Sequence, residues 1–89
     1  MATEIQLVSD LPIPPGELLS ETLETTNLSQ AELAHRMGRP PQAINEIVRG
    51  SKEITAETAI QLERVLGVPA HIWLGLEAEY QHTKARRDD

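Results

Sequence analysis

The stretch that decides the fold is "LSQAELAHRMGRPPQAINEIVRGSKEIT", Leu28 to Thr55. Its first half predicts a short helix, because Ser29 is a good N-cap and Glu32 three residues later completes a capping box. Gly38 ends this helix at a position where a left-handed backbone carries little steric cost. The chain is therefore expected to turn sharply at Gly38.

A second short helix follows after only a few residues. Proline is tolerated in a first helical turn, so this helix is predicted to run from Pro41 to about Arg49, where Gly50 stops it. So brief a joint between two helices is typical of a helix-turn-helix. The residues expected to face the core from this pair are apolar: Leu33, Ala34, Met37, Ala43, Ile44, Ile47 and Val48.

The other face of the second helix is polar and carries Gln42, Asn45, Glu46 and Arg49. Gln and Asn can bond bidentately to adenine, Arg to guanine and Glu to cytosine. These four residues are therefore predicted to read DNA bases. Four neighbouring polar residues are predicted to contact the DNA backbone: Gln30, Arg39, Ser51 and Lys52.

Three further helices are expected around this pair. One begins beside Pro15-Gly16 and runs from Glu17 to about Thr26, after a proline-rich arm over residues 1–16. Thr55 caps another that ends at Leu66, and a last helix runs from about Ala70 to beyond Tyr80. The expected fold class is all-α, with five helices.

Composition limits the possible functions. The 89 residues include no Cys, which excludes a disulfide framework, a zinc finger and a thiol nucleophile. The chain starts without a secretory signal, and no apolar run approaches the roughly 18 residues that span a membrane. We therefore expect a soluble, cytoplasmic protein.

The formal net charge of -6 argues against DNA binding when it is considered alone. The distribution of charge along the chain does not argue against DNA binding. Residues 1–28 hold five acids and no Lys or Arg, whereas residues 29–52 hold four bases and two acids. Positive charge is thus gathered in the helix-turn-helix segment. This asymmetry suits a DNA partner, and a merely solvated charged face is the alternative.

Catalysis and metal binding have little support in the sequence. His35, His71 and His82 are scattered, and they form no set with a nucleophile and an acid. Glu79 and His82 are one helical turn apart, but such a surface pair is usually incidental. We expect no enzyme activity, no metal and no cofactor.

The stretch from Leu28 to Thr55 resembles the helix-turn-helix of the Cro/repressor (XRE) family, with matching residues Gln30, Ala34, Gly38, Ile44 and Ile47. Its flanks narrow the likeness. "IPPGELLSETLE" (residues 13–24) and "ITAETAIQLERVLGVPAHIWLGLEAEY" (residues 54–80) resemble the corresponding segments of HigA-type antitoxins, also called the virulence-associated protein I group. The resemblance covers about residues 12–82.

The resemblance implies a lambda-repressor-like helix-turn-helix domain over residues 17–82, with an arm at 1–16 and a flexible tail at 83–89. It also implies a homodimer that represses its own operon and neutralises a partner toxin, typically a RelE-like ribonuclease. Members of the group usually dimerise through the C-terminal region, which here would use Ile72, Trp73, Leu76 and Tyr80. The acidic arm is one candidate for the surface that covers a basic toxin.

Two departures from the family pattern concern the second helix of the pair. Pro40-Pro41 replaces a capping Ser or Thr and a following polar or basic residue, which removes one hydroxyl and one backbone donor. Glu46 stands where many relatives carry Arg or another polar residue. Two other functions therefore stay open: a stand-alone XRE-family transcriptional regulator, and a protein-interaction module with weak DNA binding.

Overall fold

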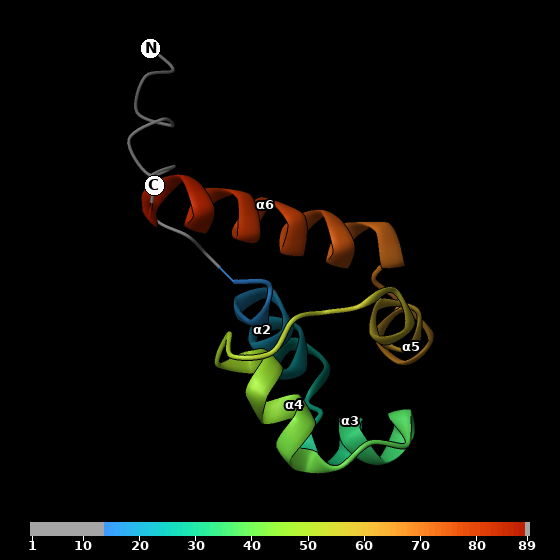
Figure 1. Ribbon diagram of the computed structural model, residues 1–89. Coiled ribbons are helices and arrows are strands. Elements are labelled where there is room, and N and C mark those ends of the chain that lie inside the picture. Colours follow the sequence, from blue (N-terminus) through green and yellow to red (C-terminus); the bar gives the residue numbers. More distant parts are fainter. Residues whose placement is uncertain (1–13, 89) are drawn as a thin grey trace.

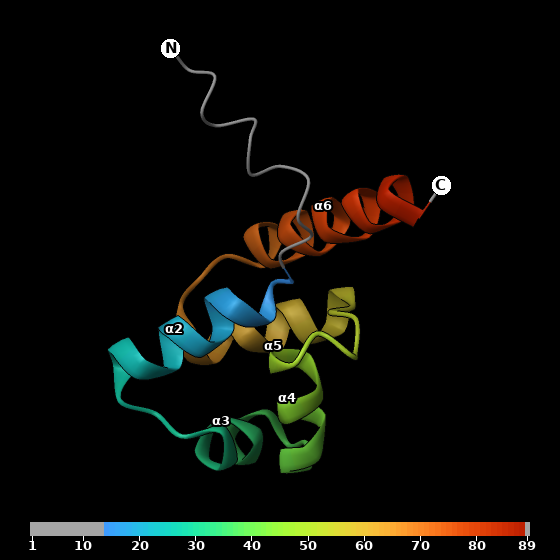
Figure 2. The same cartoon turned by 90° about the vertical axis from the view of Figure 1, so that its left-hand side faces the viewer.

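The computed structural model describes residues 14–88 and is shown from two directions in Figures 1 and 2. This part of the chain forms five helices and no strand: α2 (Gly16–Thr26), α3 (Gln30–Met37), α4 (Pro41–Val48), α5 (Ala56–Leu66) and α6 (Ala70–Asp88). The all-α, five-helix prediction is confirmed. Residues 1–13 of the predicted arm, and Asp89, lie outside the described residues.

The helices form a stack with two distinct ends. Helix α3 packs chiefly against α4, and α6 chiefly against α5; α2 packs against α4, and the contact of α3 with α5 joins the two pairs. In both views α6 lies at one end of the molecule and the α3–α4 pair at the other (Figures 1 and 2). The outer surfaces of α4 and α6 are therefore accessible at opposite ends.

The helix starts follow local capping. The Ser29 Oγ accepts a hydrogen bond from the Glu32 amide at 3.0 Å, and the Thr55 Oγ1 accepts one from the Thr58 amide at 3.3 Å. Each bond satisfies a first-turn amide that has no partner within the helix. The predicted capping box is only half formed, because the Glu32 carboxylate faces Arg36, at 3.4 Å from its Nη2.

Leucine, isoleucine, alanine, one methionine and one tryptophan form the apolar core. The largest fully buried side chains are Trp73, Leu19, Leu33, Ile44, Ile47 and Leu62. Each contributes about 1.5–3 kcal/mol by its removal from water. Trp73 is the largest of them, and its indole N–H donates to the Val68 carbonyl at 3.1 Å, so its polar atom is satisfied inside the core.

The start of α2 lies directly against the end of α4. A Cβ atom on Gly16 would overlap the carbonyl oxygens of Ile47 and Val48, so only glycine permits this approach. Pro15, just before it, is also buried. The Pro-Gly pair thus holds the last turn of α4 in addition to starting α2.

Helix α6 is longer than the sequence predicted. A flexible tail was expected over residues 83–89, whereas the structure continues α6 without interruption to Asp88. Lys, Ala and Arg are good helix formers, and Arg86 and Arg87 in the last turn interact favourably with the helix dipole. No helix among residues 14–88 combines the length and the apolar character that a membrane span requires.

Candidate nucleic-acid interface

The α3–α4 pair forms a tight helix-turn-helix. Gly38 closes α3 with φ 71°, in the left-handed region where a side chain would be strained. Pro40 is extended, with ψ 147°, and Pro41 opens α4 at a position where proline fits. Ala34 in α3 is fully buried, and its small side chain allows α4 to approach. The sequence prediction for this turn is confirmed.

The buried face of α4 leaves the opposite face to the solvent. Ala43, Ile44 and Ile47 are buried, which turns the four predicted base-reading residues outward. Gln42 and Arg49 are exposed, and Asn45 and Glu46 are half-buried. The structure therefore brings all four onto one accessible polar surface.

These outward side chains already contact one another. The Gln42 Nε2 donates to the Glu46 Oε2, and the Arg49 Nη1 donates to the Asn45 Oδ1, both at 3.4 Å. Bonds of this length between exposed groups are weak and can be exchanged for bonds to a ligand. The Glu46 carboxylate lies beside the Gln42 amide, which supplies a local donor for its charge.

Three of the four predicted backbone contacts adjoin this surface. The Gln30 Oε1 accepts a hydrogen bond from the Asn45 Nδ2 at 3.3 Å, which links the start of α3 to the middle of α4. Ser51 lies at the end of α4, where its Oγ donates to the Glu46 carbonyl at 3.2 Å. Lys52 is exposed beside it.

Arg39 differs from the other three. Its Nε donates to the Gln61 Oε1 at 2.6 Å, so the guanidinium stem is directed toward α5 instead of α4. Gln61, 22 positions away in the sequence, decides the orientation of Arg39, and the residues next to Arg39 give no indication of this contact. The remaining guanidinium nitrogens are not part of that bond.

The predicted dimer residues do not form a single exposed stripe. Ile72 is 39% exposed, Leu76 and Tyr80 are half-buried, and Trp73 is 0% exposed within one chain. Trp73 belongs to the buried core cluster and its indole N–H bonds to the Val68 carbonyl, so within one chain it has no surface to offer to a second copy. The assignment of Trp73 to an interface is therefore corrected, whereas the other three remain predictions.

Sequence reasoning did not find Glu77, which is 8% exposed in α6. Its Oε1 accepts the Ile54 amide at 3.1 Å, and its Oε2 accepts the Gln81 Nε2 at 2.6 Å. A buried carboxylate is costly unless it is hydrogen-bonded, and here both oxygens are. The sequence does contain one sign that Glu77 is buried: it lies four residues, or about one helical turn, after Trp73 and therefore on the same face of α6.

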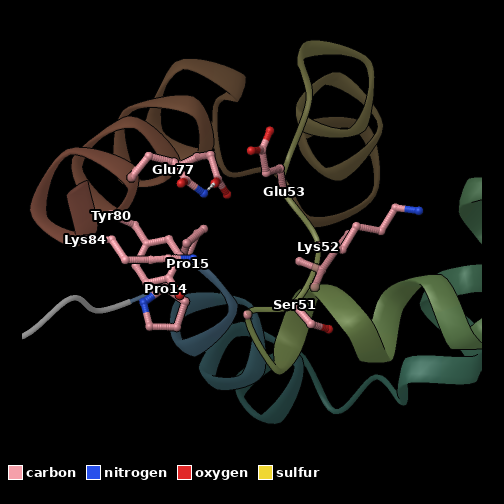
Figure 3. A pocket seen from close by; sticks show the side chains of 11 residues that line it. Pro14, Pro15, Ser51, Lys52, Glu53, Glu77, Tyr80 and Lys84 are labelled. Atoms are coloured by element: carbon pink, nitrogen blue, oxygen red, sulfur yellow. Dashed lines mark hydrogen bonds between the residues drawn. The ribbon is translucent and has the colours of Figure 1, made fainter. Parts of the chain in front are cut away.

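Glu77 borders a cleft of about 180 Å³. Figure 3 shows that three parts of the chain surround this cleft: the Pro14-Pro15 segment before α2, the connection from α4 to α5, and α6. Tyr80 and Lys84 extend the α6 side, with the Lys84 Nζ 5.4 Å from the centre of the Tyr80 ring. Residues 14–88 contain no cluster of metal-ligating side chains, in this cleft or elsewhere.

Comparison with known proteins identifies the family. Residues 19–73 match the helix-turn-helix family, and this match covers more than half of the chain. Virulence-associated protein I of Dichelobacter nodosus is 42% identical over 77 residues, which cover 85% of this chain and 71% of that protein.

Two solved structures are also similar. The Pseudomonas aeruginosa antitoxin HigA, solved with the higBA promoter, has a TM-score of 0.79 and 37% identity over 84% of this chain and 83% of the other. An addiction module antidote protein of the HigA family from Coxiella burnetii has a TM-score of 0.81 and 33% identity over 86% and 85% of the two chains.

The chain belongs to the helix-turn-helix family, in the group of virulence-associated protein I and the HigA antitoxins. This is a family of regulators and antitoxins, not of enzymes.

Proposed function

We propose that this protein is the antitoxin of a type II toxin–antitoxin module, and that as a cytoplasmic homodimer it binds and represses its own operator. The observation that carries the DNA-binding part is the outward face of α4. Its polar residues Gln42, Asn45, Glu46 and Arg49 are accessible, and the fold that presents them matches an antitoxin solved with a promoter.

Asn45 lies at the centre of the proposed base-reading surface. Its amide bonds to Gln30 on one side and its carbonyl to Arg49 on the other. Both bonds are long, at 3.3 and 3.4 Å, so Asn45 can exchange them for bonds to a base at little cost. Asn45 then reads an adenine, and Gln42 and Arg49 read neighbouring bases.

Glu46 restricts the choice of base near it. A carboxylate beside DNA is repelled by phosphate, and it is favourable where it accepts a hydrogen bond from a cytosine amine. The Glu46 and Gln42 side chains are neighbours, which supports contacts of the two with adjoining base pairs. Glu46 therefore lowers affinity for most sequences and raises selectivity for a site with cytosine at this position.

Gln30, Ser51, Lys52 and Arg39 hold the phosphate backbone in this proposal. Lys52 is the clearest candidate because it is exposed in the connection that follows α4 and carries a positive charge. Arg39 contributes only through the guanidinium nitrogens that are not bonded to Gln61. The local charge of residues 29–52 supports these contacts despite the acidity of the whole chain.

Binding to a promoter fragment, followed against salt concentration, tests the DNA-binding proposal. Each phosphate contact releases counterions, so the logarithm of the binding constant should fall linearly with the logarithm of salt concentration. A slope near zero would contradict DNA binding. In that case the fold would serve as a protein-interaction module.

The antitoxin part rests on the likeness to the HigA group and has its own test. A RelE-like ribonuclease encoded beside this gene should co-purify with the protein and lose its ribonuclease activity in the complex. If the protein binds its promoter but no neighbouring product associates with it, it is a stand-alone transcriptional regulator. The two parts of the proposal can therefore fail separately.

A further inference from the structure

The connection between α4 and α5, residues 49–55, is fastened at two points. At its start the Ser51 amide donates to the Glu46 carbonyl at 2.9 Å and the Gly50 amide to the Ile47 carbonyl at 3.1 Å, which closes the C-terminus of α4. At its end Ile54 is 3% exposed in the core, and its amide donates to the Glu77 carboxylate at 3.1 Å. Between the two points Lys52 and Glu53 are exposed.

The second fastening comes from a distant helix. Glu77 is 23 residues from Ile54 and lies in α6, at the end of the molecule opposite the α3–α4 pair. The Gln81 amide holds the other carboxylate oxygen and so limits the rotation of Glu77. Figure 3 shows the Lys52 side chain extending away from Glu77 and Tyr80, out of the cleft.

We propose that Glu77 is a positioning residue for DNA binding. Its hydrogen bond to the Ile54 amide holds residues 51–53 in a conformation that directs Lys52 toward a DNA phosphate. This inference rests on the proposed function, in which Ser51 and Lys52 contact the backbone. Without the Glu77 bond the connection gains conformational entropy, and DNA binding loses affinity because it must order the connection again.

The role requires a hydrogen-bond acceptor and not a charge. Glu77 forms no ion pair within residues 14–88; in this part of the chain Glu32 pairs with Arg36. A glutamine at position 77 keeps an acceptor for the Ile54 amide, whereas leucine has a similar size and no acceptor. Glu77→Gln should therefore retain the function that Glu77→Leu and Glu77→Ala lose.

The test measures promoter-fragment affinity against salt for the full chain and its variants. Glu77→Ala should raise the dissociation constant no more than Lys52→Ala does, and each should lower the salt slope by about 1. Glu77→Gln should bind like the unmodified chain. Glu79→Ala is the matched control, because it removes a carboxylate from the exposed face of the same helix.

A double-mutant cycle separates positioning from general weakening. If Glu77 acts through Lys52, then Glu77→Ala should add little to the loss that Lys52→Ala already causes. An equal loss in both backgrounds, or no loss from Glu77→Ala when Lys52→Ala weakens binding, would overturn the inference alone. If Lys52→Ala itself has no effect, the proposed backbone contact fails and the inference fails with it.

Hydrogen exchange in the absence of DNA supplies an independent readout. In Glu77→Ala the Ile54 amide should exchange faster, while the Ile47 amide inside α4 should keep its protection. Glu77→Leu replaces the alanine variant if the latter does not fold, because it fills the same buried site. Unchanged exchange at Ile54 in a folded Glu77→Leu protein would contradict the proposal.

Discussion

Gly16 packs directly against the carbonyl oxygen of Ile47, so the first turn of α2 supports the last turn of α4, the helix proposed to read DNA bases. The two residues are far apart in sequence, and no side chain fits between them. The Pro-Gly start of α2 is thus a part of the DNA-binding unit as well as a helix start. The position of α4 depends on this contact.

Gly16→Ala should destabilise the protein by about 1–3 kcal/mol, the usual cost of forcing extra atoms into a packed interior. The measurement is urea denaturation followed by circular dichroism. Gly75→Ala is the matched control, since a Cβ there meets nothing within 4 Å in the middle of α6. It should stabilise the helix by up to about 1 kcal/mol. Equal effects of the two changes would rule out the packing argument.

Ser29→Ala should cost about 1 kcal/mol of unfolding free energy, because the Glu32 amide loses its capping oxygen. The same denaturation experiment measures it. Ser20→Ala, on the exposed face of α2, removes a hydroxyl from a helix interior and should be neutral or slightly stabilising. A loss of the same size at both positions would show that the cap at Ser29 is not the cause.

Gln42→Ala and Asn45→Ala should reduce discrimination between bases by about 1–3 kcal/mol at one position each, if their contacts are bidentate. Competition between the operator and single-base variants measures this loss. Lys52→Ala should instead weaken binding to all sequences alike. If operator preference is unchanged in both α4 variants, another surface reads the DNA.

Ile72→Glu should convert the proposed dimer into a monomer, because it places a charge on the exposed part of α6. Sedimentation measures the change, and operator affinity should fall, since a dimer spans two half-sites about 34 Å apart. Ile60→Glu is the control: Ile60 is 45% exposed, but it lies in α5. A monomer from Ile60→Glu but not from Ile72→Glu would move the interface to α5.

Trp73→Ala, one position further along, should have a different effect. Trp73 is 0% exposed, so its loss leaves a cavity and should cost about 3–5 kcal/mol of stability. Thermal unfolding at several protein concentrations separates this loss from dimer dissociation, which depends on concentration. A midpoint that falls only at low concentration would return Trp73 to the dimer interface.

Much of the fold was predictable because its signals are local. Ser29 and Thr55 cap amides three residues away, and Gly38 closes a helix by its own backbone angle. Apolar periodicity then assigned Ile44 and Ile47 to the core. With the inner face of α4 known, its outer face followed from helix geometry, and so did the candidate base-reading residues.

Other features depended on contacts between distant segments. Periodicity placed Ile72 and Trp73 in one stripe, but the packing of α5 and α6 buries only Trp73. Arg39 remains a proposed phosphate contact, but Gln61 in α5 holds its Nε and so decides the direction of its side chain. In both cases a second helix decides what a side chain can do.

The sequence by itself determined where the helices begin, where α2 to α5 end and which face of α4 is polar, since these follow from interactions within about four residues. Only the tertiary structure decided that Gly16 supports α4 and that Glu77 holds the connection beyond it. Those contacts join segments more than twenty residues apart. Burial and hydrogen bonding at such sites depend on which helices meet, and this is a property of the assembled core.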